Sequence, residues 1–437
     1  MWIKTVWEWI LRQFGIKRTI TSDAAQYINA DFAAEYFDIS KINFNNIFSN
    51  KLATLATAES DFVIEDDNQR ARLLNETGLL VWSRIKKITA MALGTGGCLI
   101  VPYVQGGKLY FDIASQDRLC INQRSGDKIT DATVLADTVT INNTVYCRFV
   151  NYAIENNRLI ITNKVTTQYG SAARVEQWQD IKDMTVANVD RVPFGYIKSP
   201  IDNRRSSDDY GVPITYGCKS LIDEIYECLG QIKEEFELKQ VRLRVDERDF
   251  NKDKNGKPIL TSKLFMTGHG TEKQSMFDIF DPAIRESSYY TRLTSLFELL
   301  EKSVGTSKGI LTAPETRGAT ATEIKAGIYD TFALVCDIRE AVEKGMNDFL
   351  YACDILANCY SLSPIGGYSP VYDWSYSMIE SSAESWQQMK DAQAMGIRSK
   401  AELRAWQTGE TIDEAQAAVD DIAAREPSMQ TLLGMSE

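Results

Sequence analysis

Only one histidine occurs in the 437-residue chain, so any catalytic imidazole must be His269. A Ser-His-Asp or Cys-His nucleophile would have to use this residue, because imidazole is the usual base in such sites. His269 lies in a glycine-flanked stretch, TGHGT, which is typical of an exposed turn. We therefore expect no nucleophilic catalysis at His269.

Motifs for binding phosphate or calcium are absent or incomplete. No GxxxxGK[ST] motif of a P-loop occurs. GTGGC at 94–98 is interpreted as a turn from a helix to a strand, since no helix follows it to hold a phosphate. NKDKNG at 251–256 imitates an EF-hand loop, but it begins with Asn251 and has Ser262 in place of the bidentate glutamate. Pro258 also lies inside that loop, so we interpret it as a turn.

Acidic pairs and cysteines give no metal site either. Asp208-Asp209 and Glu234-Glu235 could hold Mg²⁺, but solvated surfaces explain them more simply. The cysteines are scattered without a CxxC or a zinc-finger spacing, which favours buried free thiols in a reducing cytosol; they are Cys98, Cys120, Cys147, Cys218, Cys228, Cys336, Cys353 and Cys359. We expect no enzymatic activity, no cofactor and no metal.

The composition is that of an acidic globular protein. Hydrophobic residues make up 44% of the chain, which is enough to bury cores in about two or three domains. There are 48 basic and 60 acidic residues, a net charge of -12. This balance argues against a surface that grips nucleic-acid phosphates, which requires clustered Lys and Arg.

The first half of the chain contains two regions with different hydrophobic patterns. Residues 20–95 have a helical pattern that ends at Gly94 and Gly96. From Cys98 to about residue 198 short alternating runs follow, separated by turn signals such as Gly106-Gly107 and Asn142-Asn143. The second pattern predicts an antiparallel, hairpin-rich region.

Two long amphipathic helices are predicted next, with a polar segment between them. The first, at about 215–240, would be close to 40 Å long. Its apolar stripe consists of Cys218, Leu221, Ile222, Ile225, Leu229, Ile232 and Phe236, and its other face carries Asp223, Glu224, Glu227, Glu234, Glu235 and Glu237. The second follows Pro282, with Tyr289, Leu293, Leu296, Leu300 and Val304 on its stripe. The polar segment contains the strand-like runs KLFM and MFDIF, so we predict an αα-hairpin with a small mixed α/β tip.

The stretch TAPETRGATATEI, at 312–324, connects a loop to the longest helix. Glycine and proline keep 305–319 irregular, and Thr320 with Glu323 forms a capping box at the helix start. An apolar stripe then continues to Cys353. After the linker SPIGGYSP, three short helices are predicted, each introduced by Ser or Thr.

The N-terminal stretch MWIKTVWEWILRQFGIKR is neither a signal peptide nor a spanning helix. Its tryptophans and cations are compatible with an interfacial membrane helix. An amphipathic arm that docks on its own fold or on a neighbouring subunit is the favoured interpretation.

In their order along the chain, these features resemble the portal proteins of tailed bacteriophages, of the type found in phages of Gram-positive hosts. The likeness covers roughly residues 60–425. It is carried by GVPITYGCKSLIDEIYECLGQIKEEFELKQVRLRV, FDPAIRESSYYTRLTSLFELLEKSVGTSKGIL, GATATEIKAGIYDTF and AMGIRSKAELRAWQTGETIDEAQAAVDDIAARE. DWSYSMIESSAE departs from the pattern, because Ser377 and Ser382 stand where portals of this group often have aspartates. The departure removes any basis for transferring contacts at the start of the C-terminal segment.

The resemblance implies an α+β fold with a portal-like architecture. The implied parts are an N-terminal amphipathic arm (1–20), a mixed α/β wing (21–213), stem helix 1 (214–242), a small α/β clip (243–283), stem helix 2 (284–304), a tunnel loop (305–320), the long wing helix with a linker (321–372) and a helical crown (373–437).

The resemblance also implies a function and partners. Portal proteins form a homo-oligomeric ring, usually a dodecamer, at one capsid vertex of the virion, and duplex DNA passes through it during packaging and ejection without sequence specificity. The implied partners are the terminase large subunit, a head-completion adaptor, the major capsid protein and a scaffold protein. Assembly would occur in the host cytoplasm, without secretion.

Site residues follow from the same resemblance. The tunnel loop would present Lys308, Thr312, Glu315, Thr316, Arg317 and Gly318 to the DNA channel. Glu224, Glu227, Glu234 and Glu235 would face the channel from the stem, where a negative wall repels phosphates and lets DNA slide. Lys254, Lys257 and His269 would lie in the clip, at the terminase or adaptor contact.

Two alternatives stay open at this point. One is a minor capsid or scaffold-type protein whose helices mediate assembly without enclosing DNA. The other is an unrecognised nuclease or protease, which the single histidine and the lack of a metal-ligand cluster disfavour.

Overall fold

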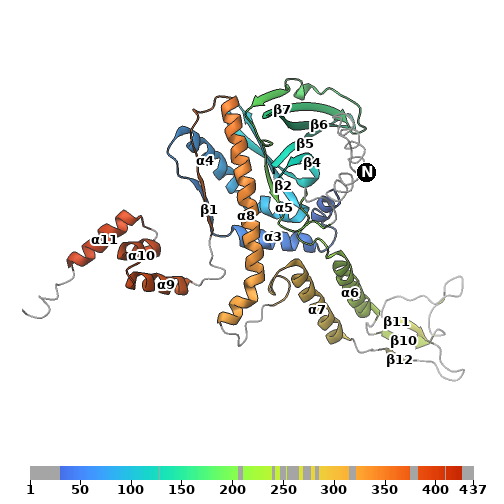
Figure 1. Cartoon of the computed structure of the whole chain (residues 1–437). Helices are drawn as coiled ribbons and strands as arrows, with labels where there is room; N and C mark the ends of the chain where they lie inside the picture. Colours follow the sequence, from blue (N-terminus) through green and yellow to red (C-terminus); the bar gives the residue numbers. More distant parts are fainter. Residues whose placement is uncertain are drawn as a thin grey trace, which may run out of the picture. The chain divides into compact units, whose positions relative to one another are not determined.

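Figure 1 shows the computed structural model of the chain. It describes residues 30–126, 128–204, 210–238, 242–246, 252, 265–268, 277–280, 285–313, 321–374, 382–408 and 410–425. The chain divides into two compact units, residues 1–373 and 374–437. Helices and sheets occupy largely separate stretches of the first unit, and the described part of the second contains three helices. The α+β class predicted from the sequence is confirmed.

Helices begin the described part of the first unit. Residues 30–36 are helical, and α3 (Phe44–Thr57), α4 (Gln69–Trp82) and α5 (Ile85–Thr95) follow. The side chains of Asn43 and Asn68 cap α3 and α4 by accepting from backbone N–H groups of the first turn. Gly96 ends α5 with a φ of 92°, the left-handed conformation that glycine adopts without strain.

One strand interrupts the region that the sequence predicts to be wholly helical. β1 (Ser60–Ile64) pairs with β13 (Pro370–Trp374), some 300 residues later in the chain. Phe62 and Ile64 are buried in alternation with exposed neighbours, which is the two-residue period of a strand. The prediction of a continuous helical region from 20 to 95 is therefore wrong at this point.

The hairpin-rich region predicted for residues 98–198 is confirmed. A three-stranded sheet has the order β3-β2-β9, and a five-stranded sheet has the order β4-β5-β6-β7-β8, with every neighbouring pair antiparallel. The bounds are β2 (Gly97–Gln105), β3 (Lys108–Ser115), β4 (Leu119–Ser125), β5 (Lys128–Ile141), β6 (Thr144–Glu155), β7 (Arg158–Thr167), β8 (Met184–Ala187) and β9 (Gly195–Lys198), with short 3-10 helices at Gln116–Arg118 and Glu176–Trp178. The predicted turns at Asn142-Asn143 and Asn156-Asn157 all have positive φ.

The long helix α8 (Ala321–Cys359) packs along β9 and β2 (Figure 1). Its predicted apolar stripe is buried from Val335 to Cys353. The helix and the strand meet at glycines. A Cβ on Gly345 would lie 2.3 Å from Cγ1 of Ile197, and one on Gly195 would lie 2.6 Å from the carbonyl oxygen of Gly345. Only residues without a side chain permit this approach.

The predicted αα-hairpin is present as α6 (Lys219–Leu238) and α7 (Glu286–Val304), which lie side by side (Figure 1). Between them, β10 (Arg242–Asp246), β11 (Phe265–Gly268) and β12 (Phe277–Phe280) form a sheet of order β11-β10-β12. The β10–β11 pair is parallel and the β10–β12 pair is antiparallel. The described residues of this tip are strands and one bridge residue.

The second unit contains α9 (Ser382–Ala394), α10 (Lys400–Thr408) and α11 (Ile412–Arg425). Two of these helices begin with reciprocal capping boxes. Ser399 and Glu402 exchange hydrogen bonds at the start of α10, and Thr411 and Glu414 do so at the start of α11. In the described parts of both units, no helix has the length and apolarity to cross a membrane.

Candidate functional site

A buried carboxylate organises the segment that follows α7. Glu301 lies in the last turn of α7 and is 1% exposed. Its Oε1 accepts four consecutive backbone N–H groups, from Gly309 (3.2 Å), Ile310 (2.8 Å), Leu311 (2.7 Å) and Thr312 (3.2 Å). The hydroxyl of Thr312 donates to Oε2 at 2.5 Å. We call this arrangement the Glu301 cradle; it is a backbone nest built around an internal anion.

The position of Glu301 is electrostatically unfavourable for an acid, because a helix C-terminus carries partial negative charge. Burial also disfavours the charged form. The hydrogen bonds from Thr312, Leu311 and Ile310 outweigh burial, so the pKa of Glu301 lies below its ordinary value. The carboxylate is thus ionised at neutral pH and holds the loop by charge-assisted hydrogen bonds.

The cradle depends on local backbone geometry and on a second attachment. Gly309 has a φ of 124°, which lets the chain turn its N–H groups toward Glu301. The N–H and hydroxyl of Thr306 both donate to the carbonyl of Glu301. On the far side, the N–H of Ser307 donates to the hydroxyl of Thr331 in α8 at 2.8 Å. The segment 306–312 is therefore tied to both helices that flank it.

Two of the predicted tunnel-loop residues lie in this segment. Thr312 belongs to the cradle, and Lys308 forms an ion pair with Glu298 of α7 at 3.1 Å. Lys308 is therefore partly neutralised by its own chain. Glu315, Thr316, Arg317 and Gly318 lie outside the described residues, as do the clip residues Lys254, Lys257 and His269.

Ion pairs across α6 and α7 fix their mutual orientation. Arg285, at the start of α7, pairs with Glu235 near the end of α6, and Arg292, farther along α7, pairs with Glu224, each at 3.0 Å. The order along one helix is the reverse of the order along the other, so the pair is antiparallel. Buried Ile225 lies on α6, and buried Leu293 and Leu296 lie on α7, along the same pair.

The same ion pairs correct the expectation of one open acidic face on α6. Glu235 is 8% exposed and faces α7, and Glu224 also reaches toward that helix. A buried carboxylate needs a partner, which Arg285 supplies. Glu227 and Glu234 remain exposed on α6. Of the four glutamates predicted to face the channel, Glu224 and Glu235 therefore also join α6 to α7.

A buried polar cluster connects the sheet region, residues 97–198, to the segment before α6. The side chain of Gln116 donates to the carbonyl of Gly211 at 2.9 Å and accepts from its N–H at 3.1 Å. Tyr196 donates its hydroxyl to the same glutamine. A Cβ on Gly211 would lie 1.9 Å from the carbonyl oxygen of Gly96, so two glycines allow the chain to cross here. These contacts hold the chain at Gly211 against the start of β2.

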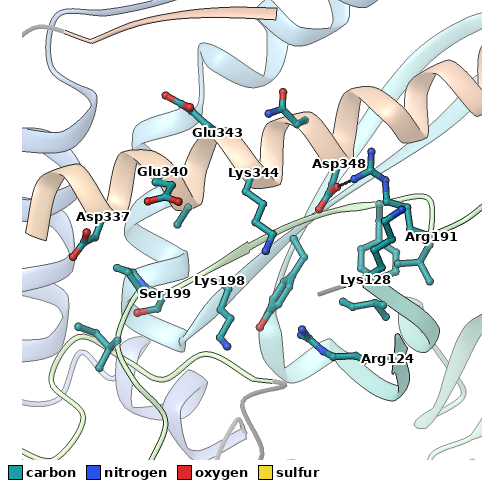
Figure 2. A pocket seen from close by; sticks show the side chains of 18 of the residues that line it. Arg124, Lys128, Arg191, Lys198, Ser199, Asp337, Glu340, Glu343, Lys344 and Asp348 are labelled. Carbon is teal, nitrogen blue, oxygen red and sulfur yellow. Dashed lines mark hydrogen bonds and ion pairs between the residues drawn. The ribbon is translucent and has the colours of Figure 1, made fainter. Parts of the chain in front are cut away.

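A cavity of about 900 Å³ lies between α8 and residues of β4, β5, β9 and the segments that flank β9 (Figure 2). Its cations are Arg124, Lys128, Arg191, Lys198 and Lys344, its carboxylates are Asp202, Asp337, Glu340, Glu343 and Asp348, and its apolar lining includes Ile129, Val192 and Phe194. Arg191 donates to Asp348 at 2.7 Å and stacks 4.2 Å from the centre of the Tyr351 ring. Lys128 contacts Asp190, which also accepts from the hydroxyl of Tyr351.

Sequence reasoning missed the cavity and the cradle. The cavity collects residues from β4, β5, β9, the segments before and after β9, and α8, and no local pattern connects them. For α8 a signal did exist, because Asp337, Glu340, Lys344 and Asp348 recur at three- and four-residue steps beside the buried apolar stripe of the helix. An acid in the last turn of a helix was the corresponding signal for Glu301.

Comparisons of the sequence with known proteins find no match. No protein-family model matches the chain, and no curated protein matches it. Among solved structures, it is similar to a chain described as "Neck of native GTA particle computed with C12 symmetry". The two are 11% identical with a TM-score of 0.43, over 83% of this chain and 89% of that chain.

Proposed function

We propose that this chain is a portal protein of the tailed-bacteriophage type, a ring at one capsid vertex through which DNA is packaged and ejected. The observation that carries the proposal is the succession of an antiparallel helix pair with a strand-built tip, a loop held by Glu301, and the 39-residue helix α8. These parts lie at the positions of the motifs that resemble portal proteins. The proposed role is non-enzymatic.

In this proposal the loop segment 306–312 is the rigid root of the tunnel loop, which continues through 313–320. Glu227 and Glu234 are the stem carboxylates available to a channel wall, where they would repel phosphates and keep DNA from sticking. The tip formed by β10–β12 is the docking site for the terminase large subunit and later for a head-completion adaptor. The wing contacts the major capsid protein.

The first test is negative-stain electron microscopy of the full-length chain, with native mass spectrometry to count subunits. We expect closed rings of identical subunits, usually twelve, with a central hole wide enough for duplex DNA. Assemblies without a hole, or a monomer that stays monomeric when capsid and scaffold proteins are added, would contradict the proposal. That outcome would favour the minor capsid or scaffold-type alternative.

A second test addresses the loop. Lys308→Glu and Arg317→Glu should leave ring formation intact and lower the amount of DNA packaged, because they add negative charge beside the passing phosphates. Lys302→Glu, at an exposed position of α7, is the matched control and should package normally. Normal packaging by both loop variants in intact rings would overturn the assignment of the loop to the channel.

A further inference from the structure

The turn between the helix at residues 30–36 and α3 exposes several large apolar side chains close together in the chain. With their exposed fractions they are Phe37 (56%), Ile39 (97%), Ile42 (52%) and, in the first turn of α3, Ile47 (39%). Exposed apolar residues that occur singly are ordinary, whereas a group of them is typical of a surface that a partner covers. We call this group the 37–47 patch.

The backbone beneath the 37–47 patch is held by the chain around it. The side-chain amide of Asn43 donates to three backbone carbonyls of residues 35–38, at 2.6 to 3.1 Å, which closes the turn onto the end of the preceding helix. Tyr226 of α6 donates its hydroxyl to the carbonyl of Ile42. The apolar side chains are therefore presented on a defined surface that continues onto α6.

The surroundings of the patch are acidic. Residues 30–47 contain three carboxylates and one cation, namely Asp31, Glu35 and Asp38 against Lys41. Lys41 lies 4.9 Å from the centre of the Tyr226 ring and also acts on Asp38. Burial raises the pKa of Tyr226, and the charges of Glu35 and Asp38 raise it further. Two of the carboxylates therefore face the same tyrosine that supports the patch.

Neighbouring helices do not reverse this balance. Asp223 of α6 also acts on Tyr226, but Lys219 lies one helical turn before Asp223, so these two charges offset one another. Lys51 lies one turn beyond the patch on α3. With Lys51 included, the carboxylates still outnumber the cations. A partner of the patch should therefore be apolar and basic.

The N-terminal stretch of the same chain has that composition. Residues 1–18 contain four cations and one carboxylate. Their large apolar residues include Trp2, Trp7, Trp9, Ile10 and Phe14. Aromatic side chains supply large contact area for an apolar surface, and cations complement an acidic rim. Residues 1–29 lie outside the described residues.

We propose that residues 1–18 dock on the 37–47 patch of their own chain. The connecting residues 19–29 can span up to about 36–40 Å. The helix at 30–36, which separates them from the patch, is about 10 Å long at the helical rise. The patch is therefore well within reach of the segment that precedes it.

The fixed position of this helix favours the segment of the same chain over that of a second copy. Tyr36 packs against Gly94 of α5, where a Cβ would overlap the tyrosine ring, and Phe32 contacts the ring of Tyr216. The helix is thus anchored beside the patch. A short tether to an anchored point raises the effective concentration of the chain's own segment. A segment from another copy has no such advantage.

The proposal is separate from the portal assignment, because both surfaces belong to one chain. Photo-cross-linking of the full-length chain tests it, with a benzophenone amino acid in place of Trp9 and mass spectrometry of the cross-linked peptides. We expect cross-links from position 9 to the 37–47 patch. Equal amounts of ¹⁵N-labelled and unlabelled chains are assembled together, and both peptides of each cross-link should carry the same label.

Variants of the patch and matched controls make the test specific. Ile39→Ser combined with Ile42→Ser removes exposed apolar surface without affecting a buried position, and it should lose most of the cross-links to the patch. Glu35→Lys should also lower their yield, because it repels the cations of the N-terminal segment. Leu80→Ser and Glu76→Lys, at exposed positions of α4, should cross-link like the wild type.

Three outcomes would each overturn the proposal: no cross-links to the 37–47 patch, cross-links that join differently labelled peptides, or yields unchanged in both patch variants. Differently labelled peptides would identify a neighbouring copy as the occupant. Flotation of the full-length chain with anionic phospholipid vesicles, without cross-links to the patch, would identify a lipid surface as the partner of residues 1–18. Ring formation is measured separately by microscopy, so failure here does not bear on the portal assignment.

Discussion

Glu301 and Thr312, eleven residues apart, are joined by a hydrogen bond of 2.5 Å from the threonine hydroxyl to the carboxylate. Together with the four backbone donors to the other carboxylate oxygen, this contact closes the chain after α7 into a fixed loop. Five of the hydrogen bonds that hold this loop end on the Glu301 side chain, so their joint contribution can be measured with a single substitution.

Replacement of Glu301 by glutamine tests the charge of the cradle. The amide keeps one acceptor oxygen but loses the charge, and hydrogen bonds to charged groups are worth about 1.5–3 kcal/mol against about 1 kcal/mol for neutral ones. We expect a loss of about 1–2 kcal/mol in the free energy of unfolding. Backbone hydrogen exchange at 309–312 should accelerate, as measured by mass spectrometry. Glu298→Gln, which removes only the contact with Lys308, is the control and should leave that exchange unchanged.

The pH dependence of the cradle follows from the lowered pKa of Glu301. A carboxylate with a depressed pKa in the folded state stabilises the fold above its unfolded value, which is about 4.3, and loses that contribution as pH falls through the folded value. The difference in unfolding free energy between wild type and Glu301→Gln should be constant from about pH 6 to 8 and shrink below about pH 4. Chemical denaturation at a series of pH values measures it. A difference that grows toward acid pH would contradict the role of the ionised carboxylate.

Arg70 is predicted to be a major determinant of stability. Its side chain is 0% exposed and donates to Asp354, to Asn358 and to the carbonyls of Ser363 and Pro364, as well as to the carbonyl of Asp354. Truncation removes all of these hydrogen bonds and leaves the partly buried Asp354 carboxylate without its cation, so Arg70→Ala should cost about 3–5 kcal/mol in unfolding free energy. Arg72→Ala removes an exposed arginine from the same helix and should change the denaturation midpoint little. Similar midpoints for the two variants would contradict the prediction.

Two glycines of α8 form a matched pair for the contact with β9. A Cβ on Gly345 would overlap Ile197, whereas one on Gly327 would meet nothing within 4 Å. Gly345→Ala should destabilise by about 1–3 kcal/mol through overpacking. Gly327→Ala should be neutral or stabilise by up to about 1 kcal/mol, because alanine is the better helix former. The midpoint of thermal unfolding, measured for both variants, tests this prediction. A midpoint of Gly345→Ala at or above that of the wild type would contradict it.

Local patterns predicted the elements of this chain because the physical causes are local. The apolar stripes of α6, α7 and α8 repeat with the helical period, and the capping boxes at Ser399 and Thr411 each lie within four residues. The hairpin turns require left-handed residues, which asparagine tolerates. These interactions join residues that are close in the sequence, so they can be predicted from the amino-acid sequence alone.

What the sequence did not predict depends on residues far apart. β1 pairs with β13 across nearly the whole first unit, and only tertiary contact shows that partner. Glu235 reads as a surface acid until Arg285, fifty residues later, is brought beside it by the helix pair. The cavity is lined by residues from six separate segments, namely β4, β5, β9, the two segments that flank β9, and α8. In each case the role of a charged residue or a strand depends on a partner far away in the sequence, and hydrophobic periodicity does not identify that partner.

Helix α8 is about 58 Å long at the helical rise, and it is packed against the rest of the first unit along only part of that length. The packed part of α8 begins at the buried Thr331 and Val335. Farther along, Arg339 donates to the carbonyl of Ala56, and Asp354 accepts from Arg70. The residues before Thr331, from 327 to 330, are mostly exposed. Ser307 bonds to Thr331, where the packed part of α8 begins, so the segment 306–312 is attached where the deflection of the helix is least. Residues 327–330 are therefore less restrained by packing than the Glu301 cradle, which is tied to α8 at Thr331.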